Sequence, residues 1–196
     1  LLLGFTFSLA LSRHEARRDL VIQEANAIGT TWLRVQLLEE PQRGAMRNLL
    51  ITYVDNRLAW SETDDPAVGR DRFADLQGRL WTVMGAAIRK DSSAQLSRGV
   101  MDAMNESFDL AAARSAARMA RLPGQVVDVL LLYMLLAAAM LGYVLAGEGR
   151  AHRVATAQLM ILLVLAFGLI LDLDRPRSGA ITVSQAPLEE LRASMR

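Results

Sequence analysis

The chain has 196 residues, of which 52% are hydrophobic and 22% charged, and its formal net charge is +1 at pH 7. This mixture is unusual for one water-soluble domain and indicates separate membrane and aqueous parts. The near-neutral charge argues against nucleic-acid binding. The absence of cysteine excludes disulfides, thiolate metal sites and cysteine nucleophiles, and only two histidines remain to support a zinc or histidine-base site.

The chain opens on an apolar run, residues 1–11, that ends at Ser12-Arg13. As a helix the run covers roughly 16 Å, about half of a hydrocarbon core that is roughly 30 Å thick. We interpret it as the remainder of a transmembrane helix whose front half is missing, so that the sequence is N-terminally truncated. The alternative is the apolar part of a signal peptide, since Ser8-Leu9-Ala10 is a weak match to a cleavage site.

Residues 12–122 show helical periodicity and almost no strand pattern, which predicts an antiparallel domain of about four helices. The first helix spans residues 12–40, with small residues clustered over 24–31 for close packing. Pro41 and Pro66 are placed at the first turns of the next two helices, and a fourth begins near Ser93. The apolar stripes of these last three helices are Met46, Leu49, Leu50, Tyr53, Val54 and Leu58; Phe73, Leu76, Leu80, Met84 and Ile88; and Leu96, Val100, Met104, Phe108 and Ala112.

Residues 123–172 contain two long apolar runs, Val126–Ala146 and Val154–Leu171, separated by a short charged connector with two glycines. Each run is long enough to cross a hydrocarbon core as a helix, so the pattern predicts a transmembrane hairpin. Asp128 lies near the start of the first run, where we expect an interfacial carboxylate, with Arg121 as the alternative partner.

The tail, residues 173–196, follows a charged membrane-exit motif: Asp172, Asp174, Arg175, Pro176 and Arg177. The helix cannot continue past the proline of this motif. We expect the two carboxylates to form a salt-bridged turn with the arginines, and cation binding is the alternative. Residues 181–183 are β-like, and Pro187 is placed to start a short helix.

Arginines near the membrane ends predict the topology. The helical domain and the tail supply eight of them, whereas the hairpin turn supplies only two. The domain and the tail are therefore expected in the cytoplasm and the turn outside. The eight are Arg13, Arg17, Arg18, Arg114, Arg118, Arg121, Arg175 and Arg177, and the two are Arg150 and Arg153.

Five segments resemble the bestrophin-like membrane proteins, and most closely the bacterial family of unknown function that carries a bestrophin-like domain. The resemblance covers essentially the whole chain. It implies an all-α integral membrane protein of the bacterial inner membrane, with a cytoplasmic helical domain. The matching segments are Leu3-Gly4-Phe5, Ser12-Arg13-His14-Glu15-Ala16-Arg17, Glu24-Ala25-Asn26-Ala27-Ile28-Gly29-Thr30, Tyr53-Val54-Asp55 and Asp172-Leu173-Asp174-Arg175-Pro176.

True bestrophins are similar to this layout, assemble as pentamers and conduct anions through a pore with a hydrophobic neck. The resemblance places that neck on Phe5 and, one turn earlier, Leu1. Ser8, Ser12, Arg13 and Arg17 would form an anion vestibule that favours chloride or other small anions. The alternatives are lipid-facing packing for the apolar pair, backbone bonding for the serines and lipid-phosphate contact for the arginines.

Two departures limit what the resemblance implies. His14 stands where bestrophins usually carry an aromatic pair, and the tail lacks an acidic cluster like the calcium clasp of the animal channels, so calcium gating is not carried over. The sequence offers no catalytic motif and implies no cofactor or metal. Two functions remain: an oligomeric anion-permeable channel in the lipid bilayer, and a non-conducting membrane scaffold whose cytoplasmic helices bind a partner.

Overall fold

The computed structural model of the chain contains seven helices within its described residues, which are 2–63, 65, 69–90, 94–145, 150–175, 177 and 179–195. They are α1 (Leu2–Val35), α2 (Gln42–Glu62), α3 (Arg70–Lys90), α4 (Ala94–Met119), α5 (Gly124–Leu145), α6 (Arg150–Asp174) and α7 (Ala186–Ser194). The all-α prediction is confirmed for this part of the chain. The β-like expectation for residues 181–183 is wrong, because no neighbouring strand offers them backbone partners and they run as an irregular segment.

The chain divides into two compact units. The first, which we call the hairpin unit, comprises Leu1–Glu15 and Ala120–Thr182, and the second, which we call the helical domain, comprises Ala16–Met119 and Val183–Arg196. The tail is divided between the two units: its residues up to Thr182 belong to the hairpin unit, and α7 belongs to the helical domain.

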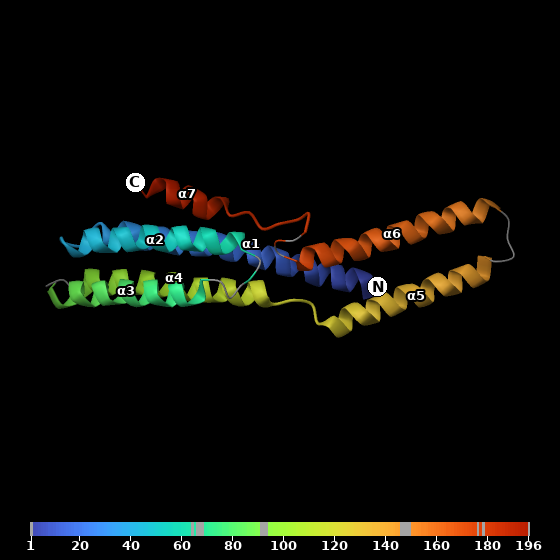
Figure 1. Cartoon of the computed structure of the whole chain (residues 1–196), viewed down its shortest axis with the longest axis horizontal. Coiled ribbons are helices and arrows are strands. Elements are labelled where there is room, and N and C mark those ends of the chain that lie inside the picture. The colour runs from blue at the N-terminus through green and yellow to red at the C-terminus, as the bar shows by residue number, and fades with distance from the viewer. Residues whose placement is uncertain are drawn as a thin grey trace. The chain divides into compact units, whose positions relative to one another are not determined.

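The helical domain is built around one apolar core. Helices α2, α3 and α4 run side by side (Figure 1), and the core also takes side chains from the later part of α1 and from α7. The periodic stripes explain this packing, because residues three and four apart share one helix face. Fully buried members of the core include Ile28, Met46, Leu50, Leu80, Met104 and Leu188.

The small residues of α1 allow close approach of neighbouring elements, as the sequence indicated. A Cβ atom added to Gly29 would lie 3.3 Å from a methyl carbon of Leu191 on α7. Helix α1 also meets α4 at Thr31, whose Oγ1 lies 3.0 Å from the hydroxyl oxygen of Ser107. Each of the two hydroxyls also lies within donating distance of a backbone carbonyl of its own helix. The small residues therefore position α1 between α4 and α7.

Prolines set the ends of several helices. The last turn of α1 tightens into i to i−3 hydrogen bonds over residues 33–38, and Pro41 then lies at the N-cap of α2. The Glu40 carboxylate accepts the Gly44 N–H at 3.1 Å and the Arg43 Nε–H at 2.9 Å. These bonds, with Arg43 the larger contributor, hold the pKa of Glu40 below its ordinary value.

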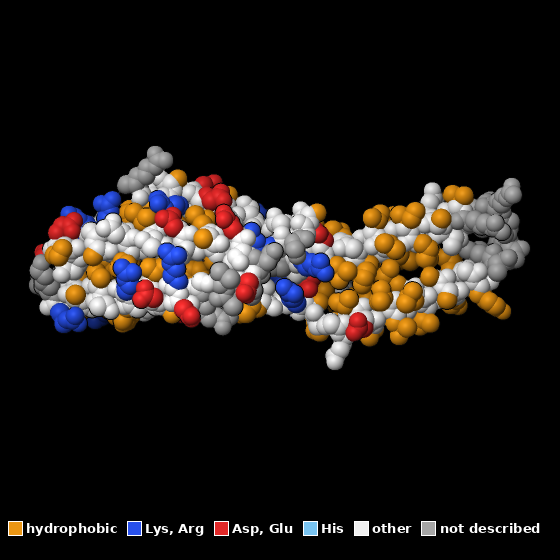
Figure 2. Space-filling view, in the orientation of Figure 1, with side chains coloured by type: hydrophobic (Ala, Val, Ile, Leu, Met, Phe, Trp, Pro, Cys, Tyr) orange, Lys and Arg blue, Asp and Glu red, His pale blue; other side chains and the backbone are white. Residues whose placement is uncertain are grey.

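The hairpin unit exposes apolar side chains instead of burying them. The apolar stretches of α5 and α6 are long and hydrophobic enough to cross a membrane, and only 6% of each is buried within the chain. Figure 2 shows hydrophobic side chains gathered over these two helices with few charges among them. Met140 and Tyr143 are 72% and 84% exposed. An exposed apolar surface of this kind is costly in water and fits a lipid environment.

Candidate functional site

The proposed pore-lining residues lie at the start of α1. Phe5, Ser8 and Ser12 are exposed, and their spacing of three and four residues puts them on one helix face. Phe5 is 78% exposed, so most of its ring is open to the surroundings of α1. Leu1, the other neck residue, lies outside the described residues.

The arginines that follow this face differ from one another. Arg13 is half-buried, and its Nη1 is enclosed without a hydrogen-bond partner among the described residues, as is Nδ1 of His14. Arg17, the other arginine expected in the vestibule, is only 5% exposed, and its Nε donates to the Ala117 carbonyl at 3.0 Å. A cation is favoured there because Ala117 lies in the last turn of α4, where backbone carbonyls are unpaired.

The membrane-exit motif forms a hydrogen-bonded turn. The Asp172 carboxylate accepts the backbone N–H groups of Ala180 at 2.7 Å and Ile181 at 2.9 Å, and Asp174 accepts the Leu122 N–H at 2.9 Å. A salt-bridged turn was expected instead. Among the described residues no ion pair joins these carboxylates to Arg175 or Arg177, because backbone donors occupy them. Pro176 lies outside the described residues.

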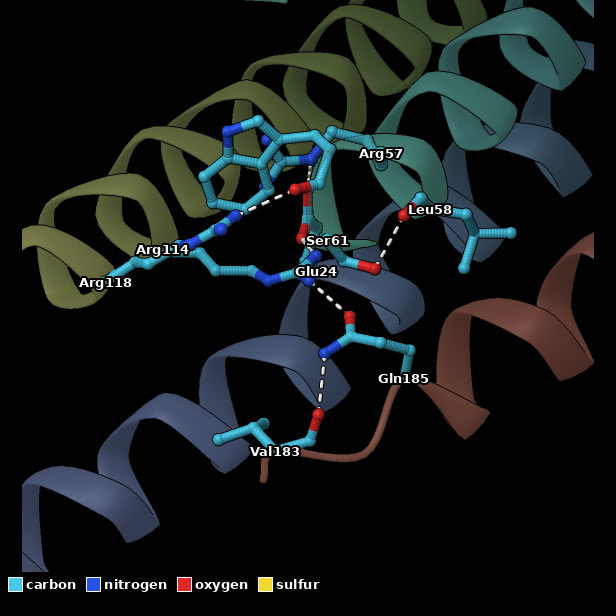
Figure 3. A network of polar contacts seen from close by, with 9 residues as sticks. Glu24, Arg57, Leu58, Ser61, Arg114, Arg118, Val183 and Gln185 are labelled. Carbon is cyan, nitrogen blue, oxygen red and sulfur yellow. Dashed lines mark hydrogen bonds and ion pairs between the residues drawn. The ribbon is translucent and has the colours of Figure 1, made fainter. Parts of the chain in front are cut away.

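A buried polar network occupies the helical domain (Figure 3). At its centre lies Glu24 of α1, which is fully buried. One of its carboxylate oxygens accepts Nε–H of Arg57 from α2, and the other accepts Nη1–H of Arg114 from α4 at 2.5 Å. The two arginines are 1% and 6% exposed. Three helices are therefore joined by charges that are removed from water.

The indole of Trp60 lies against this network. The guanidinium carbons of Arg57, Arg114 and Arg118 lie 4.6, 5.4 and 4.3 Å from its ring centroid. Arg118 also donates to the backbone carbonyls of Trp60, at 2.8 Å, and Thr63. Cation–π attraction to a buried ring offsets part of the desolvation of the guanidinium groups.

The segment that precedes α7 contacts the network through Gln185. Arg114 donates its second amino group to Oε1 of Gln185, whose own amide donates to the Val183 carbonyl at 2.9 Å. A second link is exposed: Arg192 of α7 pairs with Asp55 of α2, Nε to Oδ1 at 2.5 Å. This contact raises the pKa of Arg192, chiefly through its hydrogen bond. The tail therefore folds back on the domain through both buried and surface contacts.

Burial changes the acid–base chemistry around the network. Desolvation lowers the pKa of Arg114, although the Glu24 carboxylate opposes this. Tyr53, one turn before Arg57, is 1% exposed, and burial raises its pKa to about 12. Tyr53 therefore keeps its proton at every physiological pH.

Sequence reasoning did not identify this network. Glu24 was read as part of a small-residue cluster, and Arg114 was counted only toward topology. A signal was present, because Arg57 continues the buried stripe of Leu50, Tyr53 and Val54, where a charge needs a partner. The sequence cannot pair residues that lie 33 and 90 positions apart.

The described part of the chain holds no group of three histidines or carboxylates suited to a metal ion. The fold and the sites define a helical membrane-associated protein with an apolar hairpin and a charged helical domain. A family model for the bestrophin-like domain matches residues 1–188, and the chain belongs to this bestrophin-like family. No curated protein and no solved structure matches the chain.

Proposed function

We propose that the protein is an oligomeric, anion-permeable channel lined by the first part of α1. The family membership supports channel function, since the bestrophin-like family is known for channels. The observation that carries the assignment to α1 is the exposed face of Phe5, Ser8 and Ser12, followed by Arg13 on the same helix. In an assembly around α1, the apolar side chains would form a constriction that gates by dewetting. The hydroxyl groups and the guanidinium beyond it would favour anions.

In this proposal copies of the chain assemble around α1, as a pentamer if the assembly follows the resemblance to bestrophins. Chloride and other small anions are the permeant ions. The protein lies in the bacterial inner membrane, with α5 and α6 facing lipid and the helical domain in the cytoplasm. The excess of arginine on the helical domain and tail supports this orientation.

Chloride flux from liposomes containing the full-length protein tests the proposal. We expect flux above the empty-liposome level, and Phe5→Ala should raise it because a smaller side chain widens and wets the neck. Tyr143→Ala is the matched control, since Tyr143 is an equally exposed aromatic residue on α5 that faces lipid. Background flux from the wild type, or no change with Phe5→Ala, would sink the pore assignment.

A non-conducting scaffold is the second candidate, and one observation favours it. A groove of about 720 Å³ runs along α1 and α4 and offers polar side chains to a partner. Oligomeric geometry separates the two functions: a ring around α1 supports the channel, whereas a monomer or a symmetry axis without α1 supports the scaffold. The groove is lined by Gln23, Asn26, Ala27, Thr30, Asp102, Asn105, Glu106, Asp109, Leu110 and Ala113.

A further inference from the structure

The buried network of the helical domain has unequal charge. Glu24 supplies one negative charge, and Arg57 and Arg114 supply two positive charges, all removed from water. Within the described residues no second carboxylate pairs with either arginine. The other partner of Arg114 is the neutral amide oxygen of Gln185. An uncompensated charge in a medium of low dielectric constant is costly, so the site favours one further anion.

Two buried hydrogen-bond donors in this region have no acceptor among the described residues. The first is Nη2 of Arg57. The second is the hydroxyl of Tyr53: Gln77 approaches it, but this contact lowers the pKa of Tyr53, as expected where the amide N–H of Gln77 points to the phenol oxygen and leaves the phenol hydrogen without an acceptor. Buried donors without acceptors are rare in folded proteins.

The two donors lie on the same side of the core. Tyr53 and Arg57 are one turn apart on α2, and both contact Phe73: the ring centroids of Tyr53 and Phe73 lie 6.4 Å apart, and the Arg57 guanidinium carbon lies 5.1 Å from the Phe73 centroid. Aromatic rings stabilise the guanidinium charge, but they are weaker hydrogen-bond acceptors than an oxygen atom or a halide ion. The missing component is therefore a compact acceptor.

We propose that a monovalent anion of halide size, such as chloride, binds inside the helical domain between Nη2 of Arg57 and the hydroxyl of Tyr53. An anion satisfies both donors and cancels the excess charge. A water molecule satisfies the donors but leaves the charge, and its own two hydrogens would need acceptors. The proposal uses no residue assigned to the pore, and it stands whether or not the protein conducts ions.

A bound anion stabilises the folded state by mass action, so halide should raise the melting temperature. We would measure thermal unfolding of the full chain in detergent at constant ionic strength, replacing sodium gluconate with sodium chloride or bromide. We expect a rise of about 3–6 °C for each tenfold increase of halide above its dissociation constant. Equal melting temperatures in gluconate and halide overturn the proposal.

Single substitutions show which residues the halide-dependent rise in melting temperature depends on. Tyr53→Phe removes one donor and keeps the ring, so the halide response should shrink several-fold while the protein stays folded. Arg57→Lys keeps the positive charge but removes Nη2, so the halide response should again shrink several-fold. Arg192→Gln is the control for surface screening, because Arg192 is a partly exposed arginine of the same domain, and it should respond as the wild type does. An unchanged response in Tyr53→Phe overturns the site.

Crystals grown with bromide give a direct readout that does not depend on stability. Anomalous density beside Nη2 of Arg57 supports the proposal. Density for an ordinary water at that position, without anomalous signal at saturating bromide, overturns it.

Discussion

Glu24 and Arg114 lie 90 residues apart in sequence, yet Oε2 of the carboxylate and Nη1 of the guanidinium are separated by 2.5 Å. Because the same carboxylate also accepts Arg57, one side chain of α1 fixes the positions of α2 and α4. The three side chains are almost fully buried, so this network is more sensitive to the loss of one member than an exposed ion pair would be.

Glu24→Gln should lower the free energy of unfolding by about 3–5 kcal/mol, because it removes the carboxylate that pairs with two buried guanidinium groups. The substitution keeps the shape of the side chain, so a cavity does not contribute. Denaturant unfolding of the full chain in detergent, followed by the fluorescence of Trp60 and the other indoles, measures the change.

Asp55→Asn is the matched control. It also breaks an ion pair between a carboxylate and an arginine, but Asp55 and Arg192 are both partly exposed. Solvent screening reduces the expected loss to about 0–1 kcal/mol. Equal losses for the two variants would contradict the importance of burial.

The stability of the helical domain should fall between about pH 10 and pH 12. Burial raises the pKa of Tyr53 from 10.0 to about 12, so in this window the unfolded state has released the phenol proton while the folded state keeps it. The unfolded state binds fewer protons, and the free energy of unfolding therefore decreases as the pH rises. The contribution is fully present below pH 10 and amounts to about 2–3 kcal/mol.

Unfolding curves at a series of pH values measure this decrease. In Tyr53→Phe no phenol titrates at this position, and the decrease between pH 10 and 12 should become smaller by the same amount. A wild-type and a variant curve with identical slopes would rule out Tyr53 as the group responsible.

The sequence predicted the helices well because their causes are local. Periodic apolar stripes, Pro41 before α2 and Pro187 in the first turn of α7 act within one or two turns. The bonding of Asp172 was not predicted, because whether its carboxylate meets an arginine or a backbone N–H depends on where the backbone of Ala180 and Ile181 lies.

The buried network could not be predicted for a related reason. Each of its arginines has an adequate local explanation, for example a membrane-proximal positive charge for Arg114. Only the packing of α1, α2 and α4 shows that Arg57 and Arg114 share one carboxylate. Pairings across the fold require the tertiary structure, and a single sequence does not contain them.

Gly179→Ala should destabilise the turn that follows α6. A Cβ atom at this position would overlap the Asp172 carboxylate, so the substitution must displace the acceptor of the Ala180 and Ile181 N–H groups. The Ile181 donor is part-buried, whereas the Ala180 donor is exposed and can bond to water, so we expect a loss of about 1 kcal/mol. Gly78→Ala on α3 is the control.

A Cβ atom at Gly78 meets no atom within 4 Å, and the residue lies in the middle of an exposed helix face. Alanine has a higher helix propensity, so Gly78→Ala should raise the free energy of unfolding by about 0.5–1 kcal/mol. The two glycine variants thus shift the unfolding midpoint in opposite directions. A midpoint shift in the same direction for both would show that the Asp172 turn is not constrained by the space at Gly179.

The proposed orientation can be tested with single cysteines, because the chain has none of its own. Asn105→Cys lies on an exposed face of α4 in the helical domain, whereas Glu148→Cys lies in the connector between the two apolar runs. In intact bacterial cells a membrane-impermeant maleimide should label Glu148→Cys and leave Asn105→Cys unlabelled until the inner membrane is broken. This expectation rests on the excess of arginines on the domain and tail, because positively charged segments near membrane helices favour the cytoplasmic side. The reverse labelling pattern would place the helical domain outside and invert the proposed topology.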